Sequence, residues 1–411
     1  MMGQAVKKHR LVNNMDDADI MVVNSCSFID KSRQETIDTL SELKAWKKPN
    51  KYIILTGCYV EEQKEAVQEK YPFIDGVLNT GALTKINELI RNIQKGLKTN
   101  YYYEPQEFNF NGNDERVLST PSHYAYLKIG EGCSNHCSFC SIPLLRGPAI
   151  YKSKENILAE ARKLSENGVK ELILIAQDVT DYHWGKDYSL SSLLKDLEII
   201  DNLLWIRLLY CYPDKIDKEL IETIKASKKI VKYIDMPIQH INDTILKYMN
   251  RKSSKNMIID TIHSLRKAIP DIKLRSTVMV GFPKETDEQF NELFSFIDQT
   301  KFDQLGVFTY SKEINTASSS MRGHVDDTVK QKRLEKIMSN QQVISKKLNQ
   351  QYIGQSLSVM IDNKSGGRRY FDAPDIDGFV YVENIKKNDI GQIKKVKIKK
   401  ALEYDLIGVM D

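Results

Sequence analysis

Between residues 124 and 308, short apolar runs alternate with longer stretches of helical periodicity, a pattern typical of buried strands joined by helices. The expected strands are Tyr124–Ile129, Glu171–Ala176, Trp205–Leu209, Tyr233–Asp235, Lys273–Val280 and Phe302–Phe308. Because a helical stretch connects each strand to the next, the strands are expected to run parallel. This predicts an α/β barrel or a part of one.

Polar residues follow two of these strands, and a Gly-Phe-Pro segment follows a third. Gln177 and Asp178 follow the second strand, Gln239 and His240 follow the fourth, and residues 281–283 follow the fifth. Barrels of this type place their chemistry at the carboxyl ends of the strands. We therefore expect a site at that edge.

Three of the six cysteines lie on one short segment directly after the first expected barrel strand. Cys133, Cys137 and Cys140 have the spacing C-x3-C-x2-C. Three thiolates on one loop can bind three corners of a [4Fe–4S] cluster and leave the fourth iron open for chemistry. The alternative is a zinc site that His136 or Cys211 completes. We favour the cluster, because common zinc sites use two separated pairs of ligands.

The composition places the chain among globular proteins of about two to three domains, with 41% hydrophobic residues in 411. Its 60 basic and 55 acidic residues give a net charge of +5, which permits a nucleic-acid partner without implying one. No apolar run approaches the roughly 18 residues of a membrane span, and the amino terminus has no apolar signal core. We expect a cytoplasmic protein without a membrane partner.

Ahead of the barrel region lies a second α/β pattern, with the apolar runs Ile20–Val23 and Tyr52–Leu55 each followed by a helical stretch. Cys26 and Cys58 come just after these two runs. Open parallel sheets bind ligands at this edge, so the two cysteines could face one site. Residues 1–18 are polar where such a unit would usually open with a strand, and we expect the first strand to be missing.

The end of the chain differs in pattern from the barrel region. Residues 328–350 predict one long helix, and the alternating segment 352–411 predicts a small antiparallel β-barrel. Lys395, Lys397 and Lys399 share one face of a strand. That face could meet RNA or an RNA-rich particle, or it could be a solvated edge strand.

Three domains follow from these patterns. Residues 99–122 lose periodicity and are expected to form a linker. The expected domains are an α/β domain over 1–100, the barrel with its long helix over 119–350, and the small β-barrel over 351–411.

The cysteine loop resembles that of the radical S-adenosylmethionine superfamily, with Phe139 directly before the last cysteine. The resemblance implies that S-adenosylmethionine binds the open iron through its amino and carboxylate groups, and that Phe139 lies near the adenine. It also implies that one electron from the cluster cleaves this cofactor to a 5′-deoxyadenosyl radical. Gln239 and Arg275 could hold the polar groups of the cofactor or make the ordinary hydrogen bonds of a barrel edge.

Over nearly its whole length the chain resembles the methylthiotransferases of this superfamily, with a TRAM domain as the terminal barrel. The segments that resemble the RimO-type branch are I-A-Q-D (175–178), W-I-R-L-L-Y (205–210), Y-P-D-K-I (212–216), P-I-Q-H (237–240), M-N-R (249–251), G-F-P-K-E-T (281–286) and D-A-P-D-I-D-G (372–378). That branch adds a methylthio group to the β-carbon of an aspartate in the twelfth small-subunit ribosomal protein, which is the implied partner. The acidic last segment suits a basic protein better than a phosphate backbone. The alternatives are methylthiolation of modified adenosine in transfer RNA, as in the MiaB-like branch, and a decayed protein that binds ribosomes or RNA.

The resemblance also implies a second, auxiliary [4Fe–4S] cluster that three cysteines of the amino-terminal domain hold. Cys26 and Cys58 match two of them, whereas the first, in a C-P-K-N-like segment, has no counterpart here. Either the sequence starts too late or the auxiliary cluster cannot form in the usual way. In the family, a methyl group passes to a sulfur at this cluster, and the adenosyl radical then removes hydrogen from the β-carbon of the aspartate.

Four further positions are considered for the site. Glu131 and Arg146 bracket the cysteine loop, and we expect them to support it from outside. Lys284 stands where the family has glycine in G-F-P-G-E-T, and Cys211 replaces an aliphatic residue. We interpret Cys211 as a small buried hydrophobe.

Overall fold

The computed structural model describes residues 1–104 and 116–411, and these divide into two units. The first unit contains Met1–Val117, Glu131–Ile150 and Ser311–Ser319. The second contains Leu118–Gly130, Tyr151–Tyr310 and Ser320–Asp411. The loop with the three clustered cysteines therefore belongs to the same unit as the amino-terminal α/β region.

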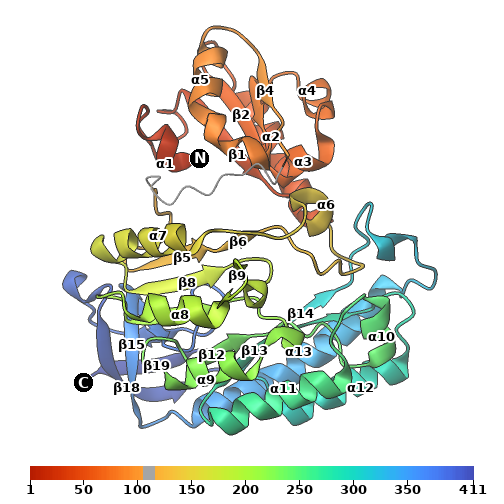
Figure 1. The fold of residues 1–411 in the computed structure, drawn as a ribbon, viewed down its shortest axis with the longest axis vertical. Coiled ribbons are helices and arrows are strands. Elements are labelled where there is room, and N and C mark those ends of the chain that lie inside the picture. Colours follow the sequence, from red (N-terminus) through yellow and green to blue (C-terminus); the bar gives the residue numbers. More distant parts are fainter. Residues whose placement is uncertain (105–115) are drawn as a thin grey trace. The chain divides into compact units, whose positions relative to one another are not determined.

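A four-stranded parallel sheet is the centre of the first unit (Figure 1). In sheet order its strands are β1 (Ile20–Ser25), β2 (Tyr52–Gly57), β3 (Gly76–Leu78) and β4 (Thr99–Tyr101). The helices of the unit are α1 (Met2–Ala5), α2 (Asp30–Trp46), α3 (Cys58–Gln63), α4 (Ala66–Lys70), α5 (Ile86–Gln94) and α6 (Ile142–Arg146). Alternate residues of β2 face opposite sides of the sheet. Ile53 and Leu55 join a core cluster with Leu40, whereas Ile54 joins a separate cluster with Leu89.

The predicted alternation of strands and helices is present in this unit, and two details differ. The segment Thr99–Tyr101 was expected in a linker, but it pairs in parallel with β3 as the fourth strand. The strand Gly76–Leu78 was not predicted, because three residues carry too little periodicity. Residues 105–115 of the expected linker lie outside the described residues.

Six parallel strands form the partial barrel of the second unit (Figure 1). They are β5 (Tyr124–Lys128), β8 (Glu171–Ile175), β11 (Trp205–Leu208), β12 (Tyr233–Asp235), β13 (Lys273–Val280) and β14 (Gln304–Thr309). The first three form one sheet and the last three another, and an isolated parallel bridge between Ile206 and Ile230 connects them. The helices between the strands are α7 (Lys154–Glu166), α8 (Leu190–Glu198), α9 (Lys218–Ala226), α10 (Asp243–Tyr248), α11 (Lys255–Ala268) and α12 (Asp287–Thr300). The predicted α/β class is confirmed.

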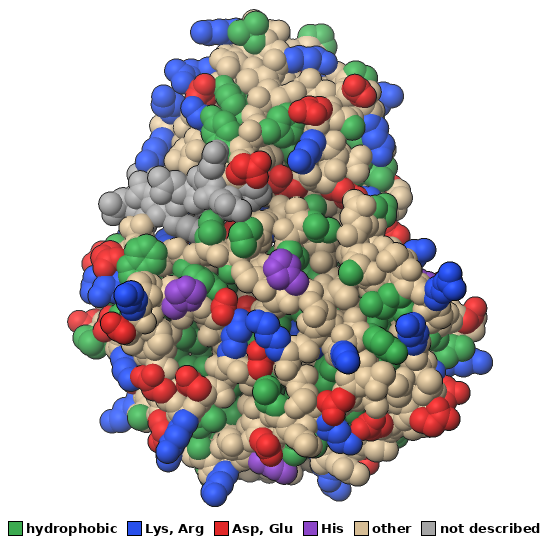
Figure 2. All heavy atoms as spheres, turned by 45° about the vertical axis from the view of Figure 1, so that its right-hand side comes forward, with side chains coloured by type: hydrophobic (Ala, Val, Ile, Leu, Met, Phe, Trp, Pro, Cys, Tyr) green, Lys and Arg blue, Asp and Glu red, His purple; other side chains and the backbone are tan. Residues whose placement is uncertain are grey.

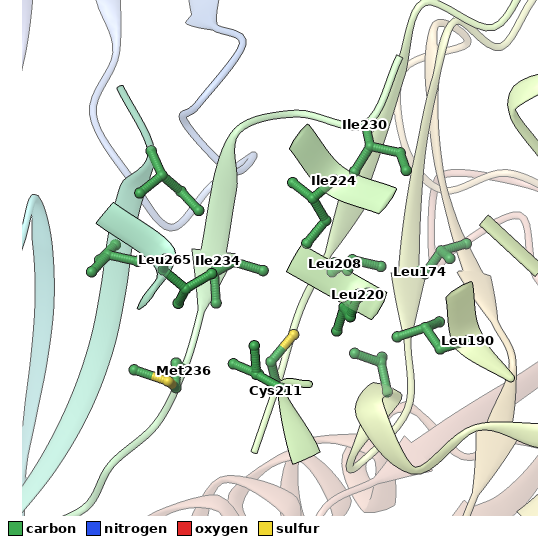
Figure 3. Close-up of a cluster of buried hydrophobic side chains, with 14 of the residues drawn as sticks. Leu174, Leu190, Leu208, Cys211, Leu220, Ile224, Ile230, Ile234, Met236 and Leu265 are labelled. Atoms are coloured by element: carbon green, nitrogen blue, oxygen red, sulfur yellow. The ribbon is translucent and has the colours of Figure 1, made fainter. Parts of the chain in front are cut away.

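An aliphatic core fills the space between these strands and helices. Figure 3 shows Leu174 and Leu208 from the strands beside Leu190 and Leu220 from the helices. Cys211 is fully buried in the same cluster. Burial raises the pKa of its thiol well above the usual value, and a protonated thiol is a poor metal ligand. This environment suits Cys211 as a small hydrophobe.

The long helix α13 (Asp327–Gln350) contacts β13, β14 and α12. Ile337 and Ile344, two turns apart, form a buried apolar stripe on one side of the helix. Buried polar residues interrupt that stripe, and one of them, Gln341, donates a hydrogen bond to the carbonyl oxygen of Phe302 at 2.9 Å. This hydrogen bond satisfies the amide nitrogen of the buried side chain.

The end of the chain forms a closed five-stranded barrel. In ring order its strands are β15 (Ser356–Asn363), β16 (Gly366–Arg369), β17 (Val380–Val382), β19 (Leu406–Met410) and β18 (Ile393–Ala401). The β17–β19 pair is parallel, and the other four pairs are antiparallel. Strand β18 pairs on both sides, so the expected edge strand is wrong, whereas Lys395, Lys397 and Lys399 are exposed to solvent as that alternative expected.

A buried network of charges connects this small barrel to the six-stranded barrel. Arg207 and Glu171 are both fully buried, with Arg207 Nη2 at 2.7 Å from Glu171 Oε1. Arg368 of β16 lies 2.9 Å from the other carboxylate oxygen of Glu171. Arg368 also pairs with Asp362 at 2.7 Å, and His123 Nε2 lies 2.7 Å from the same carboxylate. The two barrels of the second unit therefore share one set of buried ions.

The D-A-P-D-I-D-G segment turns two of its three aspartates inward. Asp372 accepts a hydrogen bond from Arg369 Nη2 at 2.8 Å, and Asp377 lies 3.3 Å from Arg275 Nε. Among the three aspartates, only Asp375 is exposed. The expectation of an acidic surface on this segment is wrong for Asp372 and Asp377, because buried arginines neutralise them.

Surface charge is mixed on the face that Figure 2 shows, where basic and acidic side chains of the described residues are interspersed. This distribution agrees with the small net charge of +5. In the part of the chain that the structure describes, no helix combines the length and the apolar character needed to cross a membrane.

The turn after β13 requires glycine at position 281. Gly281 has a φ of +72°, and a Cβ there would lie 2.2 Å from Cγ of Lys330. The Glu285 carboxylate also accepts the backbone N–H groups of Gly281 and Phe282. We expect Gly281→Ala to lower the free energy of unfolding by about 2 kcal/mol, because a strained φ and a steric clash add together. Urea denaturation measures this change.

Lys284→Gly is the matched control for that variant. Lys284 has a φ of 70°, which costs a residue with a side chain about 1 kcal/mol and glycine nothing. Glycine removes this strain from the folded chain, but it also gives the unfolded chain more conformational entropy, and the two effects oppose each other. We therefore expect the free energy of unfolding to change by no more than about 1 kcal/mol. An equal loss of stability in both variants would show that the clash with Lys330 is not the cause.

Candidate functional site

The backbone fixes the loop that carries the three clustered cysteines. Gly132 enters the loop with a φ of +74°, and a Cβ there would lie 2.3 Å from the backbone of residues 147–148. The N–H of Cys133 donates to the carbonyl of residue 147 at 3.1 Å, and the N–H of Cys140 donates to the carbonyl of Cys137 at 3.0 Å. Only glycine fits the position at which the chain enters the loop. The backbone hydrogen bonds then fix the path of the loop that carries the three thiols.

The donor set of this loop fits an iron–sulfur cluster. Cys133 and Cys137 are buried, Cys140 is half-buried, and Asn135 Nδ2 donates to Cys133 Sγ at 3.6 Å. All six cysteines lie within the described residues, and none is in a disulfide. Amide donors to sulfur are among the groups that tune cluster thiolates.

The zinc alternative requires a fourth ligand besides the three cysteines of the loop. A zinc site requires ligands that converge on one ion, whereas each cysteine of a [4Fe–4S] cluster binds a different iron. His136, the residue proposed to complete a zinc site, is exposed.

The segment 311–319 connects this loop to the amino-terminal α/β region within the first unit. The N–H of Ser318 donates to the carbonyl of Ser138 at 2.8 Å. Glu313 accepts the N–H of Asp30, the first residue of α2, at 3.4 Å and lies 3.6 Å from Arg33. Segment 311–319 therefore contacts both the cysteine loop and helix α2. No sequence pattern had indicated these contacts.

Cys26 and Cys58 stand just beyond the carboxyl ends of β1 and β2. These strands pair in parallel with Ser25 opposite Gly57, so the register brings the two following cysteines together at one edge of the sheet. Gly57 has a φ of +102°, and a Cβ there would lie 2.2 Å from the carbonyl oxygen of Ser25. Glycine therefore permits this close approach. Cys58 is buried and Cys26 is exposed.

Arg146 joins the cysteine loop to Cys58. Its Nη2 donates to Cys58 Sγ at 3.1 Å, and its Nη1 lies 3.4 Å from Glu131 Oε2. Burial raises the pKa of the Cys58 thiol, although the Arg146 charge opposes this. Burial would lower the pKa of Arg146, but the charges of Glu131, Cys58 and Glu61 outweigh it and raise that pKa. The sequence indicated Glu131 and Arg146 as supports of the loop, but no pattern linked Arg146 to a cysteine 88 residues away.

Arg275 lies in the barrel of the second unit between two carboxylates. Its Nη1 is 3.7 Å from Asp235, and its Nε is 3.3 Å from Asp377. Burial raises the pKa of Asp235 to about 6, against the opposing effect of Arg275 and of a hydrogen bond from the N–H of Tyr210. A guanidinium has five N–H donors, so these contacts do not exhaust it.

The other two residues proposed for the cofactor lie in different units. Phe139 of the first unit is half-buried beside Cys140. Gln239 of the second unit bridges β12 and β13 through its backbone, which donates to Thr277 at 2.9 Å and accepts from Met279 at 2.7 Å. Its φ of 67° places the half-buried side chain at a bend four residues after the end of β12.

Comparison with known proteins agrees with the class that this fold and loop define. Residues 127–297 match the Radical SAM superfamily, residues 1–79 match the Uncharacterized protein family UPF0004, and residues 353–410 match the TRAM domain. The solved structure of the radical S-adenosylmethionine methyltransferase TsrM from Kitasatospora setae matches with a TM-score of 0.55 and 13% identity. The match covers 71% of this chain and 63% of that chain, and it shows the fold alone. The chain is a radical S-adenosylmethionine protein, a class that uses a [4Fe–4S] cluster and S-adenosylmethionine.

Relatives of higher identity narrow this class to one family. A protein of Clostridioides difficile (strain 630) is 42% identical over 412 residues, which cover 98% of this chain and 92% of that protein. A protein of Thermoanaerobacter sp. (strain X514) is 45% identical over 409 residues, which cover 98% and 93%. Both are named ribosomal protein uS12 methylthiotransferase RimO. The chain belongs to this RimO family of methylthiotransferases.

Proposed function

We propose that this chain adds a methylthio group to the β-carbon of an aspartate in ribosomal protein uS12, the twelfth small-subunit protein. One observation carries the proposal beyond the family name: a single unit holds both the clustered cysteines and the pair Cys26 and Cys58. Placing sulfur on an unactivated carbon requires a radical source, to remove the hydrogen, and a sulfur source. The names of the relatives do not favour the transfer-RNA alternative.

Three cysteines are proposed as ligands of the radical cluster. Cys133, Cys137 and Cys140 would each bind one iron and leave the fourth for S-adenosylmethionine. When bound, these two groups supply a radical that can remove hydrogen from an unactivated carbon. The residues of the chain hold the cluster, orient the cofactor and exclude water.

Three further residues are proposed as contacts of the cofactor. Phe139 would lie against the adenine, and Gln239 would bind a polar group of the methionine part. Arg275 would bind the cofactor carboxylate through its Nη2, since its Nε and Nη1 contact Asp377, Asp235 and the neighbouring strand residues.

A second [4Fe–4S] cluster is proposed at Cys26 and Cys58. The Nε of Arg146 is a buried donor without a hydrogen-bond partner in the described structure, and it belongs to a side chain that contacts Cys58. An anionic group beside Cys58 would satisfy this donor, as the sulfides of a cluster do. The third ligand of this cluster is not assigned to any residue of the chain.

The proposal also covers the roles of the three domains and the compartment in which the substrate is met. Residues 1–100, 119–350 and 351–411 would act as the cluster domain, the radical domain and the TRAM domain. The substrate would be met in the cytoplasm, alone or within the small ribosomal subunit.

The test is the mass of uS12 after reaction with the reconstituted chain, S-adenosylmethionine, sulfide and a reductant under anaerobic conditions. We expect a gain of one methylthio group on one peptide that contains aspartate. The same gain on adenosine of transfer RNA would replace the proposal with the MiaB-like activity. No gain on either substrate, from a chain that cleaves S-adenosylmethionine, would contradict methylthiolation.

A further inference from the structure

Arg146 makes two contacts that belong to two different sets of cysteines. One is the hydrogen bond to Cys58 Sγ at 3.1 Å, and the other is the ion pair with Glu131 at 3.4 Å, two residues before Cys133. Helix α6 carries Arg146 directly after the cysteine loop. The guanidinium therefore links the loop of the radical cluster to a thiol of the amino-terminal sheet.

The position of Arg146 suits a role in tuning a cluster. A positive charge or an N–H donor at a cysteine sulfur stabilises the reduced form of a cluster, because reduction adds negative charge. Arg146 supplies both at Cys58, and its side chain is only 22% exposed, so water screens the charge weakly. Glu131 carries the opposite charge and is 6% exposed.

We propose that Arg146 is a positioning residue that holds Cys58 against the cysteine loop and sets the reduction potential of the cluster bound there. Glu131 orients Arg146 and partly offsets its charge. The inference rests on the proposed second cluster and goes beyond it, since it names the residue that couples the two cysteine sets.

The experiment isolates the second cluster and measures its potential. In a Cys133→Ala/Cys137→Ala/Cys140→Ala background, any remaining [4Fe–4S] cluster belongs to the other set of cysteines. Redox titration followed by electron paramagnetic resonance is run on this background alone and with Arg146→Gln, Glu131→Gln or Arg91→Gln. Arg91 is an exposed residue of α5 in the same unit, so its variant removes an equal charge at a place without a cysteine contact.

The two site variants are expected to act in opposite directions. Arg146→Gln removes a positive charge and lowers the reduction equilibrium constant by about tenfold, which is about 59 mV for one electron. Glu131→Gln removes a negative charge and raises the constant, whereas Arg91→Gln leaves it unchanged. Arg146→Lys keeps the charge but loses the fork of donors, so its value falls between those of the background and Arg146→Gln.

Three results would overturn the inference. The first is an equal reduction potential in Arg146→Gln and Arg91→Gln. The second is a shift of the reduction potential in the same direction in Arg146→Gln and Glu131→Gln. The third is a triple-alanine background that binds no iron. The proposed function is judged separately, by the methylthio group on uS12 with the unsubstituted chain, so either idea can fail while the other stands.

Discussion

Cys133→Ala is expected to abolish cleavage of S-adenosylmethionine and to lower the iron content of the reconstituted chain by about four atoms. Each of the three thiols binds one iron, so the variant lacks one protein ligand of the cluster that must also bind the cofactor. Iron and sulfide counting with Mössbauer spectroscopy measures the cluster, and formation of 5′-deoxyadenosine measures the chemistry. An unsubstituted chain with two clusters would contain about eight irons, and one with the radical cluster alone about four.

Cys211→Ala is the control for this experiment. Its thiol is fully buried in the aliphatic core of the second unit, so we expect unchanged iron and unchanged cleavage of the cofactor. Loss of the buried sulfur should lower stability by about 1 kcal/mol. A fall in metal content with Cys211→Ala, or a full cluster in Cys133→Ala, would contradict the ligand assignment and reopen the zinc alternative.

The fold could be predicted from sequence because its signals are local. Strand and helix periodicity located the six barrel strands, because helical stretches alternate with them along the chain. The cysteine loop was equally visible, since its three thiols and its entry glycine lie within one segment. The parallel direction of β1 and β2 follows from the βα pattern, and the register seen in the structure places Cys26 beside Cys58.

The remaining features depend on partners that are distant in sequence. Asp377 appeared as part of an acidic surface, but Arg275, about a hundred residues earlier, holds it inside the second unit. Arg146 appeared as a support of its own loop, and only the folded first unit brings it to Cys58. No periodicity encodes such pairs, because the sequence pattern reports burial and not the identity of the neighbour.

Glu171→Gln is expected to lower the free energy of unfolding of the second unit by about 3 to 5 kcal/mol. Glu171 and Arg207 are completely buried, and Arg368 is 3% exposed, so the carboxylate neutralises two arginines that water cannot reach. Glutamine keeps the size of the side chain but leaves one positive charge without a counterion. Urea denaturation followed by the fluorescence of Trp205, buried in the cluster shared by both barrels, measures the loss.

Glu219→Gln provides the comparison, because Glu219 pairs with Lys195 at 2.9 Å on the surface, with both side chains more than half exposed. Exposed ion pairs contribute about 0 to 1 kcal/mol, so this variant should unfold close to the unsubstituted chain. A second comparison removes the imbalance itself, since Glu171→Gln combined with Arg207→Gln leaves only Arg368, which keeps Asp362 as its partner. The double variant should recover part of the lost stability. If it is instead less stable by the sum of both single losses, the charges do not act as one network, and the two barrels are held together by their apolar contacts alone.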